Sequence, residues 1–278
     1  MPELPQVRAL AERLDELLAA ATFRGADPLH FTALKTVEPT PESLEGRTVS
    51  GASSRGKWLT LDLGGPRILV HLSQSGRVVI EDPPKATRPR GGVVRLRFDG
   101  RPSVMVKEFG TDRRAGWWVL SPGEEGPLAK LGPEAGTDAF DEVLRTSEDR
   151  RRLHTMLRDQ RTVAGIGRGY ADDILHRAAL SPYASLASLG SEDRDRLVAA
   201  AGEVLSDAIE GERERTGGLD ETSLANVFTI HGRWGSACPR CGEDLRRVSY
   251  ESHEVTYCPR CQTGGRVLAD RRFSRLIR

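Results

Sequence analysis

The sequence predicts an α+β fold: an N-terminal helix with an antiparallel β-sandwich, then a helical domain, then a small C-terminal unit built on cysteines. Two observations lead to this prediction. The spacing of apolar residues is helical at the start of the chain, then alternating, and then helical again. All four cysteines lie between residues 238 and 261. A chain of 278 residues is long enough for one large domain or two ordinary ones.

The composition describes a folded protein. Lys and Arg number 41 against 40 Asp and Glu, giving a net charge of +1, and 38% of the residues are hydrophobic. Mixed charges of this kind argue against disorder. No apolar run approaches the ~18 residues of a membrane span. Charged residues are spread through the first twenty positions, which argues against a signal peptide. We therefore expect a cytoplasmic protein with no membrane partner.

The first helix and the strands follow from two different periods. From Val7 onward, apolar residues recur at the i, i+3, i+4, i+7 spacing of an amphipathic helix. Three later runs alternate apolar and polar residues, as strands with one buried face do. Glycines and prolines at 64–66 and 83–92 supply turns, so closure into a sandwich or flattened barrel is expected. The alternating runs cover residues 59–63, 68–72 and 94–98.

The second half of the chain is predicted to be helical. The stretch Ser121–Pro127 has no periodicity and is typical of a linker. Helical spacing follows it, most clearly in the apolar stripe from Leu197 to Ile209. The expected helices cover residues 138–146, 148–160, 168–178 and 191–212. The expected domains are 1–120, a linker at 121–137, a helical domain at 138–230 and a zinc finger with a basic tail at 231–278.

The zinc finger is predicted from two Cys-x-x-Cys pairs, Cys238 with Cys241 and Cys258 with Cys261, separated by sixteen residues. Each pair places two thiolates on one side of a tight turn, and four sulfurs form a tetrahedral shell that suits Zn²⁺. Two disulfides or a redox pair are the alternative, which the symmetric spacing and the lack of a secretion signal disfavour. Because four sulfurs leave no open position, we expect one structural zinc ion. Ten arginines against five acids give residues 232–278 a charge of +5.

Four segments together resemble the formamidopyrimidine-DNA glycosylase and endonuclease VIII family of base-excision repair enzymes. They are Met1-Pro-Glu-Leu-Pro5, His71-Leu-Ser-Gln-Ser-Gly76, Val163-Ala-Gly-Ile-Gly167 with Tyr170-Ala171, and His231-Gly-Arg-Trp-Gly235 before the cysteines. The resemblance spans the whole chain and no single motif carries it. It implies an N-terminal helix and β-sandwich, a helical domain with a helix-two-turn-helix, and a zinc finger.

The resemblance also implies catalytic residues. With Met1 removed, Pro2 presents a secondary amine that attacks C1′ of the damaged nucleotide and forms an iminium, and β- and δ-elimination then cut the strand. Glu3 would protonate the opening sugar, and Lys57 would hold a phosphate. An amine with a pKa near ~8 is partly neutral at pH 7 and can attack. The plain alternatives are ordinary helix-start residues at positions 2 and 3 and a solvated surface lysine at 57.

Contacts to DNA are implied in the same way. A Gly-x-Gly turn that opens a helix can bind a phosphate with its free amides, although such a turn also occurs in plain helix hairpins. The residues expected to contact DNA are His71, Gln74, Arg113, Arg114, Gly165, Gly167, Arg168, Tyr170 and His253.

Several positions depart from the family pattern. The glutamate expected after Leu-Pro is Gln6, the methionine that fills the gap left by the flipped nucleotide is Gln74, and the aromatic wedge is replaced by Ala115. Three phosphate contacts are also altered, with His154 for a lysine, Arg168 for an asparagine and His253 for an arginine.

These departures, with little room for a long base-capping loop between Glu212 and His231, favour an endonuclease VIII-like enzyme over an 8-oxoguanine enzyme. The expected function is a monomeric DNA N-glycosylase and AP lyase acting on damaged DNA. A non-catalytic DNA-binding protein of the same fold and an unrelated zinc-ribbon protein are the alternatives.

Overall fold

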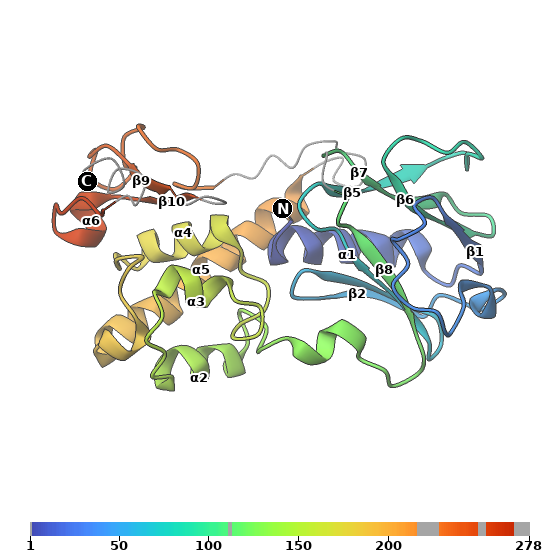
Figure 1. The fold of residues 1–278 in the computed structure, drawn as a ribbon, viewed down its shortest axis with the longest axis horizontal. Helices are drawn as coiled ribbons and strands as arrows, with labels where there is room; N and C mark the ends of the chain where they lie inside the picture. Colours follow the sequence, from blue (N-terminus) through green and yellow to red (C-terminus); the bar gives the residue numbers. More distant parts are fainter. Residues whose placement is uncertain (1, 111–112, 216–227, 250–253, 270–278) are drawn as a thin grey trace, which may run out of the picture. The chain divides into compact units, whose positions relative to one another are not determined.

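The computed structural model describes residues 2–110, 113–215, 228–249 and 254–269, and Figure 1 shows its fold. The chain forms two compact units. The first is the chain up to Ala129 together with the segment that begins at Ile209. The second is Lys130–Ala208 together with the segment that follows Asn226. In the described part of the chain, no helix is both long and apolar enough to cross a membrane.

The first unit is a helix packed with a β-sandwich. α1 (Leu4–Leu18) buries one apolar face, as its spacing predicts. The strands pair antiparallel in two four-stranded sheets, with the orders β1-β6-β7-β5 and β2-β3-β4-β8. The predicted helix and sandwich are therefore confirmed. The strands are β1 (Phe23–Pro28), β2 (Gly51–Arg55), β3 (Trp58–Asp62), β4 (Arg67–His71), β5 (Gly76–Glu81), β6 (Gly92–Phe98), β7 (Ser103–Glu108) and β8 (Gly116–Leu120).

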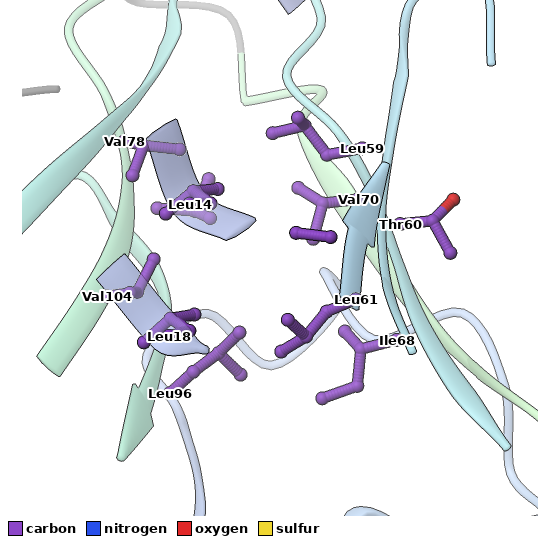
Figure 2. A pocket seen from close by; sticks show the side chains of 12 residues that line it. Leu14, Leu18, Leu59, Thr60, Leu61, Ile68, Val70, Val78, Leu96 and Val104 are labelled. Atoms are coloured by element: carbon purple, nitrogen blue, oxygen red, sulfur yellow. The ribbon is translucent and has the colours of Figure 1, made fainter. Parts of the chain in front are cut away.

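The core of this unit lies where α1 meets both sheets. Leu14 and Leu18 of α1 point between the sheets, toward Val78 and Val104 on one side and Leu61 on the other (Figure 2). These side chains line an apolar cavity of about 30 Å³. The alternating apolar residues therefore form the inner face of the sandwich, which leaves the strand ends and turns to carry polar side chains.

The second unit contains four helices, a short hairpin and a final helical turn in its described part. The helices predicted over 138–146, 168–178 and 191–212 are confirmed to within two residues. The predicted hairpin between the cysteine pairs is also present, as antiparallel strands β9 and β10. The elements are α2 (Asp138–Thr146), α3 (Leu153–Arg158), α4 (Arg168–Arg177), α5 (Ser191–Glu214), β9 (Arg246–Ser249), β10 (Glu254–Tyr257) and α6 (Pro259–Thr263).

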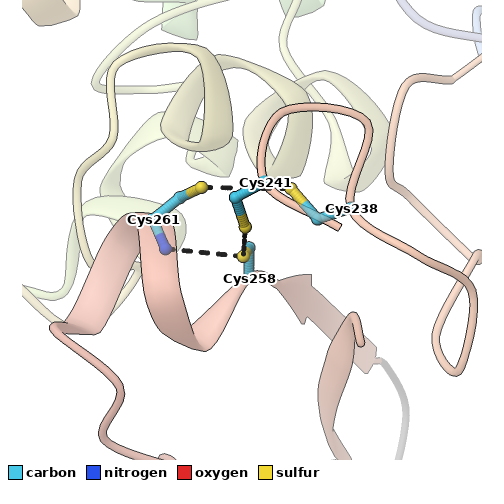
Figure 3. Close-up of side chains that lie close together, drawn as sticks. All are labelled: Cys238, Cys241, Cys258 and Cys261. Carbon is cyan, nitrogen blue, oxygen red and sulfur yellow. Dashed lines mark hydrogen bonds between the residues drawn. The ribbon is translucent and has the colours of Figure 1, made fainter. Parts of the chain in front are cut away.

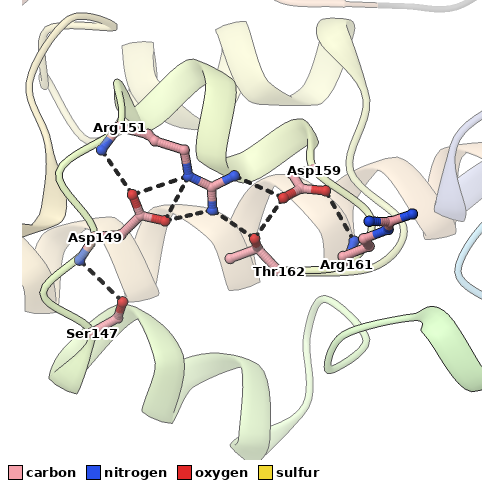
Figure 4. Close-up of polar contacts among 6 residues, drawn as sticks. All are labelled: Ser147, Asp149, Arg151, Asp159, Arg161 and Thr162. Atoms are coloured by element: carbon pink, nitrogen blue, oxygen red, sulfur yellow. Dashed lines mark hydrogen bonds and ion pairs between the residues drawn. The ribbon is translucent and has the colours of Figure 1, made fainter.

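The helix predicted over 148–160 is wrong in its first part, because α3 covers only Leu153–Arg158. The carboxylate of Asp149 accepts hydrogen bonds from the backbone N–H of Arg151 at 2.8 Å and from its guanidinium at 2.6 Å. A side chain that bonds the backbone two residues ahead competes with a helix. The same guanidinium donates to Asp159 at 2.7 Å (Figure 4). The stretch before α3 is therefore a polar connection fixed to the loop after it.

Candidate functional site

Pro2 and Glu3 lie at the start of α1, and both are buried. Glu3 is the N-cap residue, and its carboxylate and the side chain of Gln6 form a reciprocal capping box. In this box the backbone N–H of Glu3 donates to Oε1 of Gln6 at 3.0 Å. The Gln6 amide nitrogen then donates to the carboxylate of Glu212 at 2.9 Å. The N-terminal corner is therefore fixed by side chains and is not a frayed helix end.

Gln6 departs from the family pattern in a way that its surroundings explain. An amide can accept with its oxygen and donate with its nitrogen, and Gln6 does both. A glutamate at this position would face the carboxylate of Glu212, which repels it. Glu212 is also bound by the guanidinium of Arg215 at 2.9 Å. The arrangement of this corner therefore requires a neutral side chain at position 6.

Lys57 lies in the turn between β2 and β3, and it is only 6% exposed. The side chain is therefore not the solvated surface lysine of the plain alternative. His71, the last residue of β4, lies opposite Trp58 in the strand register, and their ring centroids are 4.5 Å apart. Burial, and to a lesser extent the ammonium of Lys57, lower the pKa of His71 to about 4. At neutral pH His71 is thus an uncharged donor or acceptor beside the lysine charge.

Two connections of the first unit meet at the end of the β5–β7 pair. Gln74 is exposed on the turn from β4 to β5, and the backbone N–H of Phe109 donates to the carbonyl of Ser75 in this turn at 3.1 Å. A Cβ at Gly76 would lie 2.2 Å from the Leu72 carbonyl oxygen, so this tight turn requires glycine.

The connection after β7 is anchored from inside. The buried carboxylate of Glu108 accepts from the backbone N–H groups of Arg114 and Ala115, each at 2.9 Å. Arg113 and Arg114 are exposed, whereas Ala115 belongs to the hydrophobic core. The structure therefore places Gln74 and the two arginines at a common edge, and it turns position 115 inward.

In the second unit, the Gly-x-Gly turn precedes α4. Gly165 has a φ of +106°, which favours glycine, and Gly167 is the N-cap residue of α4. The side chain of Gln160 bridges the turn: its oxygen accepts from the N–H of Gly165 at 2.9 Å and its nitrogen donates to the carbonyl of Ile166 at 2.8 Å. Arg168 follows as the first, half-buried residue of α4. The turn is thus a shaped loop at the N-terminus of α4, held by the side chain of Gln160.

Two residues of this unit that the sequence linked to DNA contacts, Tyr170 and His154, are buried. Tyr170 is 5% exposed, and its ring lies 5.1 Å from that of Phe228. His154 is 3% exposed, and its Nε2 lies 3.2 Å from a carboxylate oxygen of Asp172. These side chains support α4 from inside. His253 lies outside the described residues.

The four cysteines form a cluster in which all sulfurs lie within 4.8 Å of one another (Figure 3). Sulfur atoms of Cys241 and Cys258 are 3.5 Å apart, and those of Cys238 and Cys261 are 3.9 Å apart. Metal–sulfur bonds of about 2.3 Å in a tetrahedron place sulfurs about 3.8 Å apart, so the cluster fits a four-coordinate metal.

The pKa values of these thiols are also consistent with a metal site. The backbone N–H of Glu243 lowers the pKa of the Cys241 thiol to about 7, whereas burial raises the pKa of Cys258 and Cys261. Buried thiolates close together repel one another, and a divalent cation removes this cost. The four cysteines can therefore hold a metal ion.

Comparison with known proteins supports what this geometry suggests. Residues 1–118 match the formamidopyrimidine-DNA glycosylase N-terminal domain, and residues 131–217 match the H2TH domain of the same enzyme. A formamidopyrimidine-DNA glycosylase of Corynebacterium jeikeium is 33% identical over 94% of this chain and 100% of its own length. One of Geobacter metallireducens is 32% identical over 95% and 100%.

The chain belongs to the formamidopyrimidine-DNA glycosylase family. The predictions of family, fold class and enzyme class are thereby confirmed. Solved structures of Lactococcus lactis Fpg agree at the level of fold: its complex with an N7-benzyl-Fapy-dG containing DNA has a TM-score of 0.81 at 25% identity, over 94% of this chain and 100% of the other. Its complex with an oxidized pyrimidine containing DNA gives the same TM-score and coverage at 24% identity.

Sequence reasoning missed two buried carboxylates on α4 of this family member. Asp173 accepts hydrogen bonds from three consecutive backbone N–H groups, those of Thr229 (2.7 Å), Ile230 (2.9 Å) and His231 (3.2 Å). Burial raises the pKa of Asp173, and these amides oppose that shift. The carboxylate therefore holds the chain that leads into the cysteine-containing unit.

Asp172 also binds the part of the chain that carries the cysteines. Its carboxylate accepts from the backbone N–H of Thr256 in β10 at 3.0 Å and lies 2.6 Å from Nδ1 of His231. The only hint in the sequence was that two adjacent acids directly follow Tyr170-Ala171. Because acids on a helix are usually solvated, their residue type alone does not indicate that they are buried. The helix that begins at the Gly-x-Gly turn thus also holds the hairpin between the two cysteine pairs.

Proposed function

We propose that this chain is a bifunctional DNA glycosylase and AP lyase that uses Pro2 as nucleophile and Glu3 as acid. The observation that carries the proposal is the N-terminal corner, where Pro2 and Glu3 are buried together and the backbone of Glu3 is bonded to Gln6. An ordinary helix start does not require a side chain from residue 212 to fix it. A reactive amine does require such fixing, because attack needs a defined geometry.

The chemistry follows from these two groups. With Met1 removed, the Pro2 nitrogen forms a bond to C1′ of the damaged nucleotide as the bond from C1′ to the base breaks. Glu3 donates a proton to the opening sugar ring. The resulting iminium acidifies the C2′ protons, so loss of one expels the 3′ phosphate, and δ-elimination then expels the 5′ phosphate. Water finally hydrolyses the sugar fragment from the proline nitrogen.

Phosphate binding is assigned to each unit separately. In the first unit, Lys57 supplies the charge, and His71, whose lowered pKa keeps its ring neutral, supplies a hydrogen bond. In the second unit, Arg168 directly follows the turn Gly165–Gly167 and offers a guanidinium at the N-terminus of α4, where the helix dipole favours a phosphate. Contacts of this type position DNA without reading its sequence. Chromosomal DNA is then the site of action, which fits a cytoplasmic, nucleoid-associated protein.

Borohydride trapping on an abasic-site duplex tests the nucleophile. Wild-type protein with a mature N-terminus, verified by intact mass, should form a covalent adduct. Pro2→Gly or an uncleaved N-terminal tag should abolish the adduct while DNA binding persists. Undiminished trapping in either protein would refute Pro2 and require a lysine nucleophile. Binding of damaged DNA with no trapping by the wild type would favour the non-catalytic alternative.

For the substrate, we propose an endonuclease VIII-like preference for oxidised pyrimidines, abasic sites and bases whose pairing is already lost. The support is the exposed Gln74 and the inward-facing Ala115, since a polar side chain and a buried methyl group plug a vacated stack poorly. The solved complex of Lactococcus lactis Fpg with oxidized pyrimidine containing DNA is consistent with such substrates on this fold. The expected shortness of the base-capping loop concerns residues 216–227, which lie outside the described residues.

Cleavage of one lesion in duplex, bubble and single-stranded DNA tests this preference. Flipping a paired base costs a few kcal/mol, which lesions without pairing avoid. The wild type should therefore cut bubble and single-stranded substrates at least as well as duplex. Gln74→Met should shift the balance toward duplex. A strong duplex preference of the wild type would contradict the proposal.

We further propose that the ion at the cysteine cluster is one structural Zn²⁺. The support is the set of four sulfur ligands at tetrahedral spacing. Cys258→Ser should release zinc and weaken DNA binding while the β-sandwich keeps its circular dichroism. A metal content near zero in native protein would overturn the assignment.

A further inference from the structure

Phe109 is an exposed aromatic residue directly after β7, with 42% of its surface accessible. Its backbone N–H is bonded to the carbonyl of Ser75, so the residue is fixed beside the exposed turn that carries Gln74. The ammonium of Lys107 lies 5.0 Å from the centroid of its ring. The ring therefore lies at the edge of the sandwich, not in its core, and it has a cation beside it.

The charges around this ring favour an anionic partner. Lys107 is the direct cross-strand partner of Arg77 in the β5–β7 register. Like charges opposite each other destabilise a sheet, and a bound anion relieves that repulsion. Exposed Arg113 and Arg114 follow on the same connection. The guanidinium of Arg113 lies beside Gly91: a Cβ atom built on Gly91 would be 3.2 Å from it. An aromatic ring surrounded by cations is suited to a partner that carries flat rings next to negative charges. Nucleic acid is such a partner, because its bases lie next to its phosphates.

The other end of the connection cannot supply an aromatic contact. Ala115 is 5% exposed and packs in the core, and its backbone N–H is bonded to the buried carboxylate of Glu108. A larger side chain at this position would have to displace core residues. The exposed aromatic ring of this edge is therefore Phe109, at the opposite end of the same connection.

We propose that Phe109 is a base-stacking residue whose ring stacks on a nucleobase left unstacked at the lesion, while Lys107 and Arg77 meet the neighbouring phosphates. This inference rests on the proposed action on damaged DNA. An aromatic ring stacks on any base, so the contact serves lesions of different chemistry and tolerates unpaired strands. Phe109 is then a specificity-determining residue for DNA conformation and not for the identity of the damaged base.

The test uses the full chain and a duplex with a tetrahydrofuran abasic analogue opposite 2-aminopurine, whose fluorescence reports stacking. Phe109→Ala should weaken binding about 10-fold or more and remove the fluorescence change that the wild type causes. Phe109→Tyr should preserve both. Phe31→Ala is the matched control, because Phe31 is a 94% exposed phenylalanine in a different loop of the same unit, and it should behave as the wild type.

Two outcomes overturn the proposal: an unchanged affinity in Phe109→Ala, or a weakened affinity with the fluorescence change intact. Borohydride trapping at saturating natural abasic DNA separates this test from that of the proposed function. Phe31→Ala should be trapped to the same extent as the wild type, because the amine of Pro2 is unaltered. Failure of the wild type to be trapped refutes the lyase proposal, whereas the stacking result comes from the fluorescence experiment alone.

Discussion

The carboxylate of Asp173 gives the sharpest test of how the segment that leads to the cysteine cluster is held on α4. Asp173→Ala removes the acceptor of three backbone N–H groups, at Thr229, Ile230 and His231. Each such hydrogen bond contributes about 1 kcal/mol net, so the local loss should be about 3 kcal/mol. That corresponds to a rise of roughly two orders of magnitude in the open population of this segment.

Amide hydrogen exchange by mass spectrometry measures this opening directly. Protection should fall over residues 229–231 and over β9 and β10, while the strands of the β-sandwich keep theirs. Asp207→Ala is the control, because Asp207 is an exposed acid on α5 whose side chain is 71% accessible. Exchange in residues 229–231 that is equal in Asp173→Ala and the wild type would refute the reasoning.

Three further predictions concern charge. Because folding lowers the pKa of His71 from 6.5 to about 4, its contribution to stability is complete above pH 6.5 and is lost as the pH falls to about 4. The loss should be about 3 kcal/mol, and His71→Gln should flatten the pH dependence of urea unfolding in that window. Arg168→Ala should reduce the slope of log K against log salt by about 0.9 and weaken binding to all sequences alike; an unchanged slope would mean that Arg168 faces away from DNA. Glu81→Ala should destabilise the sandwich by about 3 kcal/mol in thermal unfolding, because it leaves the 1% exposed guanidinium of Arg95 without its 2.6 Å partner. Methionine at both positions should recover most of that stability, and a single mutant as stable as the wild type would contradict the argument.

The parts of the fold that the sequence predicted are those in which one local pattern decides the outcome. The apolar stripe from Leu197 to Ile209 repeats over several turns, and α5 follows it. The cysteine pairs are equally local, since the spacing within each knuckle already places two sulfurs together. Strand β2 was missed because Gly51–Arg55 has no β-branched or aromatic residue, and its pairing with β3 and α1 decides its conformation.

The residues of the candidate site were predicted from motifs, but the contacts that hold them were not. Pro2, Glu3 and Lys57 came from motifs, whereas the bond from Gln6 to Glu212 joins residues 206 apart in sequence. The interior place of His154 depends on Asp172, a partner on another helix. Contacts of this kind arise from tertiary packing, and no periodicity along the chain indicates them.

The bond between Gln6 and Glu212 also has a consequence for the order in which the protein is made. Pro2, Glu3 and Gln6 are made early in synthesis, but Glu212, which accepts the hydrogen bond from Gln6, is made only after the segment 130–208 of the other unit. A chain interrupted anywhere within that segment has Gln6 without its partner Glu212. The N-terminal corner therefore reaches its hydrogen-bonded arrangement only after most of the chain has been synthesised.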